Sequence, residues 1–185
     1  MNQVKDRFKD KYTTVAVPAL QKEFGYKNPH QIPRIEKVVV SAGVGRAVSD
    51  SKYLDNATDT IAKITGQHPV TTKAKKSIAS FKVREGNKVG TTVTLRGLRA
   101  DAFLDLLVAV VLPRVRDFRG ISATAFDTFG NYSLGIEDHT IFPQISYEDL
   151  NSPHGLQVNI VTSAKTSPEA KRLLELMGFP FRRTA

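Results

Sequence analysis

The chain has 185 residues, with 27 Lys and Arg against 18 Asp and Glu, which gives a formal net charge of +9. This length suits one compact domain or at most two small ones, and the excess of basic charge favours a polyanionic partner. The absence of Cys excludes disulfides, thiolate-bound metals and a Cys nucleophile. The four His residues lack ligand spacing, and no apolar run approaches the ~20 residues of a membrane-spanning helix. We therefore expect a cytoplasmic protein with no metal, no cofactor and no membrane contact.

The first part of the chain predicts helices and strands in alternation. A helix is expected over Val4–Phe24, kinked or restarted at Pro18. The β-branched run Ile35–Ala42 predicts a strand. A helix that begins at residue 50 or 51 and ends near residue 65 follows, because its apolar residues recur at helical spacing. A short strand is expected over Pro69–Thr72.

The middle of the chain is less regular. The polar and basic segment Lys73–Glu85 predicts a long loop, and the alternating segment Lys88–Arg96 predicts a strand. An apolar helix is expected over Ala102–Leu112, with a stop near Pro113. The Gly-punctuated stretch beyond it predicts irregular structure, with two short strands around residues 133 and 141.

The last elements are a strand over Leu156–Ser163 and a helix that Ser167 opens and Gly178 ends. The core order is then β-α-β-β-α-β, the split-βαβ arrangement of ferredoxin-like and RRM-like folds. It predicts an α+β fold whose mostly antiparallel sheet has helices on one face and leaves the other face free for a partner. No repeat or linker is visible, so residues 1–185 are expected to form one domain, from which a basic loop protrudes at about 73–86.

Charge is distributed unevenly. Six basic residues and one acid lie between Lys73 and Lys88, mixed with hydroxyl residues and Phe81. Lys and hydroxyl groups bind phosphate and ribose oxygens, whereas the ring of Phe81 either stacks on a base or tucks back to anchor the loop. Residues 120–164, in contrast, contain acids but no Lys or Arg. This stretch predicts a protein-facing surface, for which Phe129, Ile141 and Phe142 are apolar candidates; the alternative is that they cover the domain's own core.

Enzyme motifs are incomplete. Gly43 and Gly45 follow a strand as in a dinucleotide-binding loop, but Val48 stands where the third glycine belongs. Adjacent carboxylates at Glu137 and Asp138 diverge on either a helix or a strand, so they favour the cap of a short helix over a catalytic pair.

Longer motifs carry a resemblance. The segment ITGQHPVTTKAKKSIASFKVREG, residues 64–86, resembles the signature of the large-ribosomal-subunit protein L-five family of bacterial type. Six further blocks occur in the family's order: IPRIEKVVVSAGVG, VTLRG, LPRVRDFRGI, GNYSLGI, IFPQI and LLELMGFPF. The chain departs from the family at Ser41, where the family has Asn, and at Thr128-Phe129, where it has Gly-Arg.

The resemblance implies a non-enzymatic constituent of the large ribosomal subunit that binds 5S rRNA and helps attach it in the central protuberance. It also implies contacts with large-subunit rRNA, neighbouring large-subunit proteins, peptidyl-site tRNA through the basic loop, and a protein of the small-subunit head as an intersubunit bridge. Two other functions are weighed beside it: a free-standing basic RNA-binding regulator, and a small enzyme acting on an anionic substrate. Co-sedimentation with large subunits would distinguish a ribosomal protein from the free-standing regulator. A steep salt dependence of RNA binding would distinguish an RNA-binding protein from the enzyme.

The candidate site residues follow position by position from the resemblance and from the charge pattern. For 5S rRNA they are Ser41, Gly43, Gln67, Thr94 and Arg96. For tRNA they are Lys73, Lys75, Lys76, Ser77 and Lys82. For the general RNA backbone they are Arg114, Arg116 and Arg119. For the small-subunit bridge they are Glu137, Asp138, Glu148 and Asp149.

Overall fold

The computed structural model describes residues 7–48, 50–145 and 153–182. The chain forms two compact units built from interleaved segments. Unit 1 comprises Met1–Val38, Arg96–Leu134 and Asn159–Ala185, and unit 2 comprises Val39–Leu95 and Gly135–Val158. The expectation of a single domain over residues 1–185 stays a prediction.

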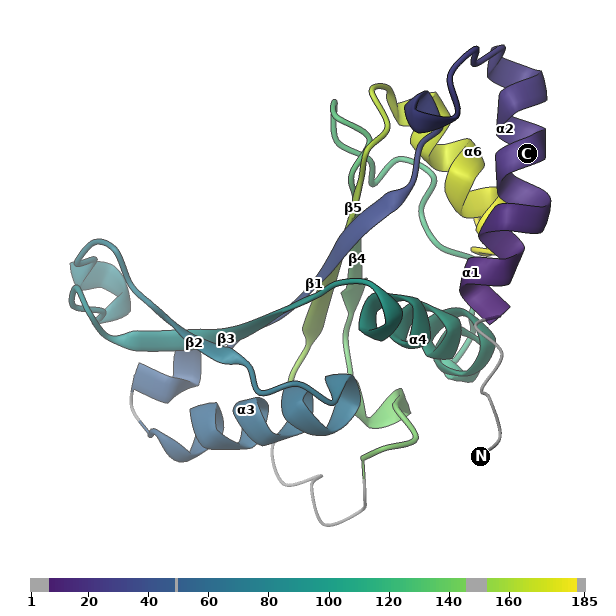
Figure 1. Ribbon diagram of the computed structural model, residues 1–185. Helices are drawn as coiled ribbons and strands as arrows, with labels where there is room; N and C mark the ends of the chain where they lie inside the picture. The colour runs from purple at the N-terminus through teal and green to yellow at the C-terminus, as the bar shows by residue number, and fades with distance from the viewer. Residues whose placement is uncertain (1–6, 49, 146–152, 183–185) are drawn as a thin grey trace. The chain divides into compact units, whose positions relative to one another are not determined.

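One five-stranded sheet has the strand order β2-β3-β1-β5-β4 (Figure 1). Its strands are β1 (Ile35–Gly43), β2 (Val70–Lys73), β3 (Lys88–Leu95), β4 (Tyr132–Ile136) and β5 (Leu156–Thr162). Strands β2 and β3 pair antiparallel, with Val70 opposite Thr92 and Thr72 opposite Gly90. The predicted α+β class with a mostly antiparallel sheet in split-βαβ order is confirmed.

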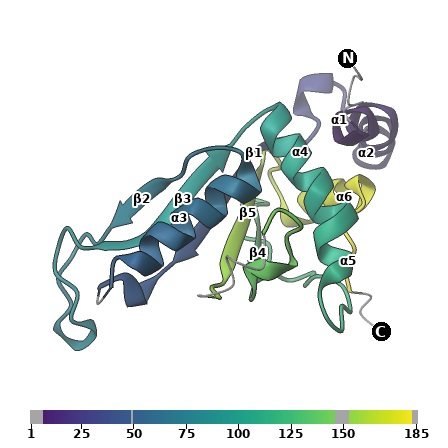
Figure 2. The same ribbon diagram turned by 90° about the horizontal axis from the view of Figure 1, so that it is seen from below.

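Unit 2 is built around helix α3 (Lys52–Thr65), which packs along β3 (Figure 2). The apolar residues Leu54, Ile61 and Ile64 are buried, as their helical spacing predicts. Gly66 ends the helix in the left-handed conformation, at φ 64°, where a residue without Cβ is favoured.

Unit 1 contains most of the other helices: α1 (Arg7–Lys11), α2 (Val17–Phe24), α4 (Leu98–Leu106), α5 (Leu112–Arg114) and α6 (Ser167–Met177). A π-helical turn joins α1 to α2 and another joins α4 to α5. Each turn ends two residues before a proline, Pro18 or Pro113. Proline lacks an N–H and clashes with the carbonyl four residues earlier, and a wider turn moves that carbonyl away. Helix α2 begins at Val17, directly before Pro18, and α5 ends at Arg114, directly after Pro113, so the expected restart at Pro18 and the expected stop near Pro113 are confirmed.

Two predictions were wrong in detail. The helix expected from Ala102 begins at Leu98, directly after Gly97. The strand expected around Ile141 is a 3₁₀ turn over His139–Ile141, because the Asp138 carboxylate accepts a hydrogen bond from the Thr140 amide at 2.9 Å and caps the turn.

Candidate nucleic-acid interface

The sheet of unit 2 has one apolar and one polar face. Along β3, Thr91, Val93 and Leu95 are buried, while the alternate residues Thr92 and Thr94 are half-buried and exposed. Side chains alternate between the two faces of a strand, so these threonines lie on the face opposite the buried residues. The same alternation places Ser41 of β1, half-buried, on that face, and Thr72 joins it because it lies opposite Gly90. We call Ser41, Thr72, Thr92 and Thr94 the hydroxyl face.

Two glycines shape the hydroxyl face in different ways. A Cβ at Gly90 would lie 2.6 Å from the Ala42 carbonyl oxygen and 3.0 Å from Thr72 Oγ1, so only glycine allows the strands to pack this closely. Gly43, at the end of β1, has no heavy atom within 4 Å of its Cβ position in the part of the chain that the structure describes. Its backbone is therefore open to a ligand.

Four of the five residues predicted for 5S rRNA lie in unit 2. Gln67 follows the end of α3, and its side-chain amide donates to the Thr94 carbonyl at 3.4 Å. This contact brings Gln67 beside Thr94 of the hydroxyl face. Arg96 comes two residues after Thr94, is exposed, and belongs to unit 1.

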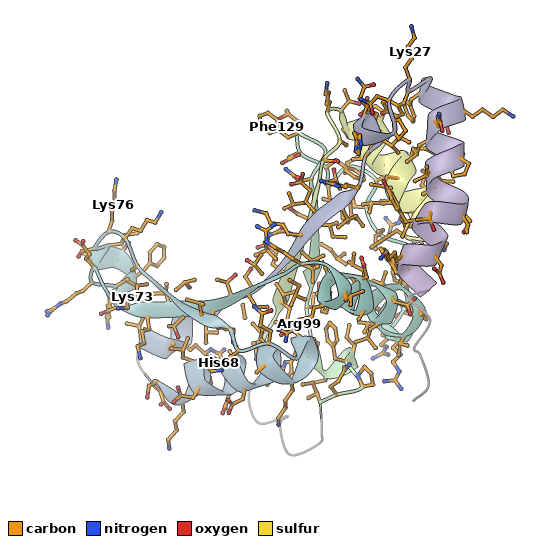
Figure 3. All side chains as sticks on the ribbon, viewed as in Figure 1. Lys27, His68, Lys73, Lys76, Arg99 and Phe129 are labelled. Carbon is orange, nitrogen blue, oxygen red and sulfur yellow. The ribbon has the colours of Figure 1, made fainter. Side chains whose placement is uncertain are left out.

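The predicted basic loop is an ordered excursion between β2 and β3. Its base is closed by the Ala74 amide, which donates to the Asn87 carbonyl, and by the Gly86 amide, which donates to the Ala74 carbonyl. Nearer the tip, Ile78 and Val83 form a β-bridge. All five predicted tRNA-contacting residues are exposed, and Lys76 points away from the ribbon at the end of the loop (Figure 3).

Internal contacts explain why the loop holds its shape. The Ser77 hydroxyl accepts a hydrogen bond from the Glu85 amide at 2.9 Å, so this predicted contact residue also supports the loop. Lys82 adopts the left-handed conformation, with φ 53°. The Phe81 ring is 72% exposed, so the alternative in which it tucks back to anchor the loop is wrong. The ring is available for stacking.

The second basic cluster, Arg114, Arg116 and Arg119, is exposed in unit 1. Arg116 lies 3.9 Å from Asp117, but the two side chains are 97% and 87% exposed. An ion pair in water contributes little, so Arg116 keeps its charge available to an anion.

The predicted acidic surface is only partly described. Glu137 is exposed, whereas Asp138 caps the His139–Ile141 turn, in agreement with the expected cap of a short helix. Glu148 and Asp149 lie outside the described residues. Phe142 is 1% exposed and belongs to the core, so the idea that it meets a partner is wrong, while Phe129 is exposed.

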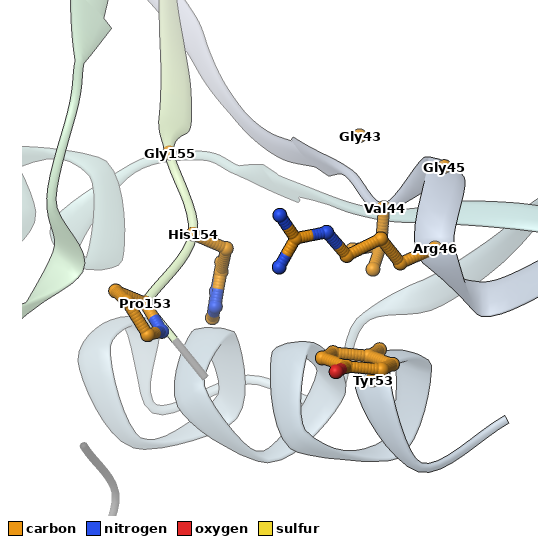
Figure 4. A pocket seen from close by; sticks show the side chains of 8 residues that line it. All are labelled: Gly43, Val44, Gly45, Arg46, Tyr53, Pro153, His154 and Gly155. Atoms are coloured by element: carbon orange, nitrogen blue, oxygen red, sulfur yellow. The ribbon is translucent and has the colours of Figure 1, made fainter. Parts of the chain in front are cut away.

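A pocket of about 450 Å³ lies in unit 2 beside the end of β1 (Figure 4). Its lining includes Gly43, Gly45, Arg46, Tyr53 and His154. The Arg46 side chain extends across it towards His154. The loop that Gly43 begins lacks the third glycine of a dinucleotide-binding motif. The pocket is therefore not assigned to a dinucleotide.

The described residues offer no site of two other kinds. Residues 7–48, 50–145 and 153–182 contain no group of three potential metal ligands. Within the same ranges, no helix has both the length and the apolar character needed to cross a membrane.

Sequence reasoning missed Thr72 and Thr92 as members of the hydroxyl face. For Thr92 the signal was present in the segment VGTTVTL, because Thr92 and Thr94 alternate with buried residues. Thr72 lies outside that segment and joins the face through the pairing of β2 with β3.

A basic, ordered loop next to a hydroxyl-lined sheet face defines an RNA-binding protein of α+β class. Comparison with known proteins gives the family. Residues 28–84 match the family described as ribosomal protein L5, and residues 88–181 match the C-terminal region of the same ribosomal family. The chain belongs to the ribosomal protein L5 family.

Curated relatives agree along nearly the whole chain. The large ribosomal subunit protein uL5 of Rubrobacter xylanophilus is 53% identical over 176 residues, which cover 95% of this chain and 98% of the relative. The protein of the same name from Acholeplasma laidlawii is 53% identical over 95% of this chain and 98% of its own length. That of a Synechococcus species is 54% identical over 92% of this chain and 94% of the relative.

Proposed function

We propose that the hydroxyl face of unit 2, with Gly43, Gln67 and Arg96, binds 5S rRNA and helps attach it to the large subunit. As a member of its family, the chain is a structural, non-enzymatic protein of the large ribosomal subunit and resides with it in the cytoplasm. The observation that carries the proposal is the hydroxyl face itself, because its short polar side chains sit beside open backbone at Gly43.

The chemistry of this face suits RNA backbone recognition. Hydroxyl groups both donate and accept, so they pair with 2′-hydroxyls as well as phosphate oxygens. The strands carry no paired aromatic rings of the kind on which an RRM stacks bases. Recognition by shape and backbone is therefore favoured over recognition of splayed bases. Ser41 keeps a donor and an acceptor where the resembled family has Asn, with a shorter reach.

Filter binding of the purified chain to 5S rRNA tests the proposal. Arg96→Ala removes a charge-assisted contact, so we expect an affinity loss of about 1.5–3 kcal/mol, or roughly 10- to 150-fold. Thr94→Ala removes a neutral hydrogen bond and should cost about 0.5–1.5 kcal/mol. Lys22→Ala is the control, since it removes an exposed cation of α2 that has no place in any proposed RNA contact, and it should leave 5S rRNA affinity unchanged. Unchanged affinity for both Thr94→Ala and Arg96→Ala would remove them from the site.

The basic loop is proposed to reach peptidyl-site tRNA through Lys73, Lys75, Lys76, Ser77 and Lys82. Its cationic side chains are exposed, and its backbone is closed on itself by hydrogen bonds. A preformed arm loses little conformational freedom on binding, so its charges are presented at low entropic cost.

The remaining surfaces have separate proposed partners. Arg114, Arg116 and Arg119 are proposed to contact large-subunit rRNA, where exposed guanidinium groups pair with phosphates. Glu137 and Asp138, together with Glu148 and Asp149, are proposed to face a basic protein of the small-subunit head. Exposed charges of this kind mainly steer encounter, which suits a contact that slides as the subunits move.

A free-standing RNA-binding regulator remains the alternative to the proposed ribosomal roles. Sucrose-gradient fractionation of cell extract distinguishes the two, because a ribosomal component co-sediments with large subunits in stoichiometric amounts. Recovery of the chain only in the slowly sedimenting fractions would favour the regulator.

A further inference from the structure

Phe129 is the most exposed large hydrophobic side chain among the described residues of this chain, at 73%. It lies in the short loop Asp127–Asn131 that precedes β4, within unit 1. In Figure 3 the Phe129 side chain points away from the ribbon. An isolated exposed ring is common on protein surfaces, so its significance depends on how it is held and on what surrounds it.

The loop that carries the ring is rigidly built. The Asp127 carboxylate accepts hydrogen bonds from the Phe129 amide at 2.9 Å, the Asn131 amide at 2.7 Å and the Asn131 side chain at 2.7 Å. The Gly130 carbonyl accepts from Thr162 Oγ1 at 2.8 Å. Phe129 is thus displayed in a fixed position, and binding through it requires little further ordering of the backbone.

Gly130 fixes the loop against the rest of unit 1. It adopts φ +79°, and a Cβ there would lie 3.1 Å from the Cβ atoms of both Ala164 and Ala170. This close packing leaves no room for the loop to fold inward. The ring therefore stays outside because the backbone beneath it is packed.

Exposed basic and hydroxyl residues lie on the segments next to this loop. Hydrogen bonds connect Arg34 with Ser163, and Thr162 with Gly130 and Asn131. The start of β1, the end of β5 and the start of β4 therefore lie in a row. Two strand spacings of about 4.8 Å place the Arg34 backbone roughly 10 Å from the loop. Arg34 is exposed, and so is Lys165, two residues beyond Ser163.

The acids of this surface are turned towards backbone donors. Both oxygens of Asp127 are occupied within the loop, and Glu169 Oε2 accepts from the Lys165 amide at 3.3 Å. The exposed Asp127 carboxylate lies closest to the ring and is bound by three donors of the loop, while the exposed cations of this row are Arg34 and Lys165. Ser163 and Thr166 add exposed hydroxyl groups.

We propose that Phe129 stacks on an unpaired RNA base while Arg34 and Lys165 contact the adjoining phosphates. Every base offers a π-face, and a ring with exposed cations and hydroxyls on neighbouring segments matches a single-stranded nucleic acid. Phe129 is the one exposed large hydrophobic residue of this loop, so the ring is not part of an extended apolar patch of the loop. This contact lies in unit 1 and does not depend on the assignment of the hydroxyl face to 5S rRNA.

The first test uses the purified full chain and an eight-nucleotide oligouridylate RNA. Stacking predicts that Phe129→Leu, which keeps an apolar side chain but removes the π-face, weakens binding at least fivefold, whereas Phe129→Trp binds within about twofold of the native chain. Phe129→Leu should not change the slope of log affinity against log salt, while Arg34→Gln and Lys165→Gln should each reduce it by about 0.7. Equal affinities of the Leu variant and the native chain would overturn the proposal.

The second test asks what the ring meets on the ribosome. The photoreactive analogue p-benzoylphenylalanine replaces Phe129, the chain is incorporated into large subunits, and adducts are mapped after irradiation. The proposal predicts adducts with ribosomal RNA at an unpaired nucleotide. Adducts with protein alone, or no adduct with RNA, would overturn it. The same analogue at Thr13, an exposed residue of the π-helical turn after α1, is the control for non-specific labelling.

Discussion

Gly90→Ala perturbs the centre of the hydroxyl face with one methyl group. The new Cβ would lie 2.6 Å from the Ala42 carbonyl oxygen, a distance that real Cβ atoms do not adopt. The obstacle is backbone, so no side-chain rotation relieves it and β1 and β3 must move apart. Thr72 Oγ1, 3.0 Å away, must also shift.

Overpacking of this kind costs about 1–3 kcal/mol of the free energy of unfolding. For a chain of this length each kcal/mol lowers the melting temperature by roughly 2–4 °C, so we expect a fall of about 2–12 °C. Because the displaced atoms underlie the proposed 5S rRNA site, affinity for 5S rRNA should fall in the same variant.

Gly135→Ala is the matched control, because Gly135 also lies within a strand, β4, but has no heavy atom within 4 Å of its Cβ position among the described residues. Alanine there should be neutral or stabilise by up to about 1 kcal/mol. Urea unfolding followed by circular dichroism compares the two variants with the native chain. A Gly90→Ala variant as stable as the native chain would refute the close packing of β1 on β3.

Three further predictions concern other surfaces. Replacing residues 75–84 by Asn-Gly keeps the hydrogen bond between Ala74 and Asn87; it should leave 5S rRNA affinity within about twofold in filter binding but impair peptidyl-site tRNA binding on the ribosome. A loss of 5S rRNA affinity in proportion to the charge removed would assign the loop to the 5S rRNA site. Glu137→Lys, and Asp138→Asn with its cap preserved, should weaken subunit association in low-salt gradients, and no effect of either would exclude the acidic bridge. Burial raises the pKa of Tyr132 to about 12 from 10.0, so the contribution of its neutral form to the free energy of unfolding is complete below pH 10 and is lost as pH rises towards 12. Tyr132→Phe should therefore flatten the plot of unfolding free energy against pH between pH 10 and 12, and an unchanged plot would show that the loss of stability there does not come from Tyr132.

The regular elements could be predicted because their signals are local. Strand β1 and helix α3 follow from β-branched runs and apolar periodicity, and α3 ends at a glycine that adopts the left-handed conformation. The restart at Pro18 and the stop near Pro113 were predicted, whereas the π-helical turns before the two prolines were missed, since such turns depend on packing that no sequence period reveals. The turn at Ile141 was missed because a capping carboxylate outweighs the β-propensity of one isoleucine.

The site was predicted in part for the same reason. The basic loop and Thr94 stand out by charge and alternation within one segment. The row formed by Arg34, Ser163 and Phe129 joins segments about 30 to 130 residues apart, and only the strand order brings them together. Burial of Phe142 and exposure of Phe129 likewise depend on tertiary packing, because both are phenylalanines in irregular segments.

Directed hydroxyl-radical cleavage tests the central claim, that the hydroxyl face binds 5S rRNA. The chain has no Cys, so a single substitution suffices to tether iron-EDTA at one place. Val70, 69% exposed on β2 and opposite Thr92, borders the face, whereas Asp59 is exposed on α3, the helix that packs along β3. The account predicts strong local cleavage of 5S rRNA from Val70→Cys and weak cleavage from Asp59→Cys. Stronger cleavage from Asp59→Cys than from Val70→Cys would contradict it.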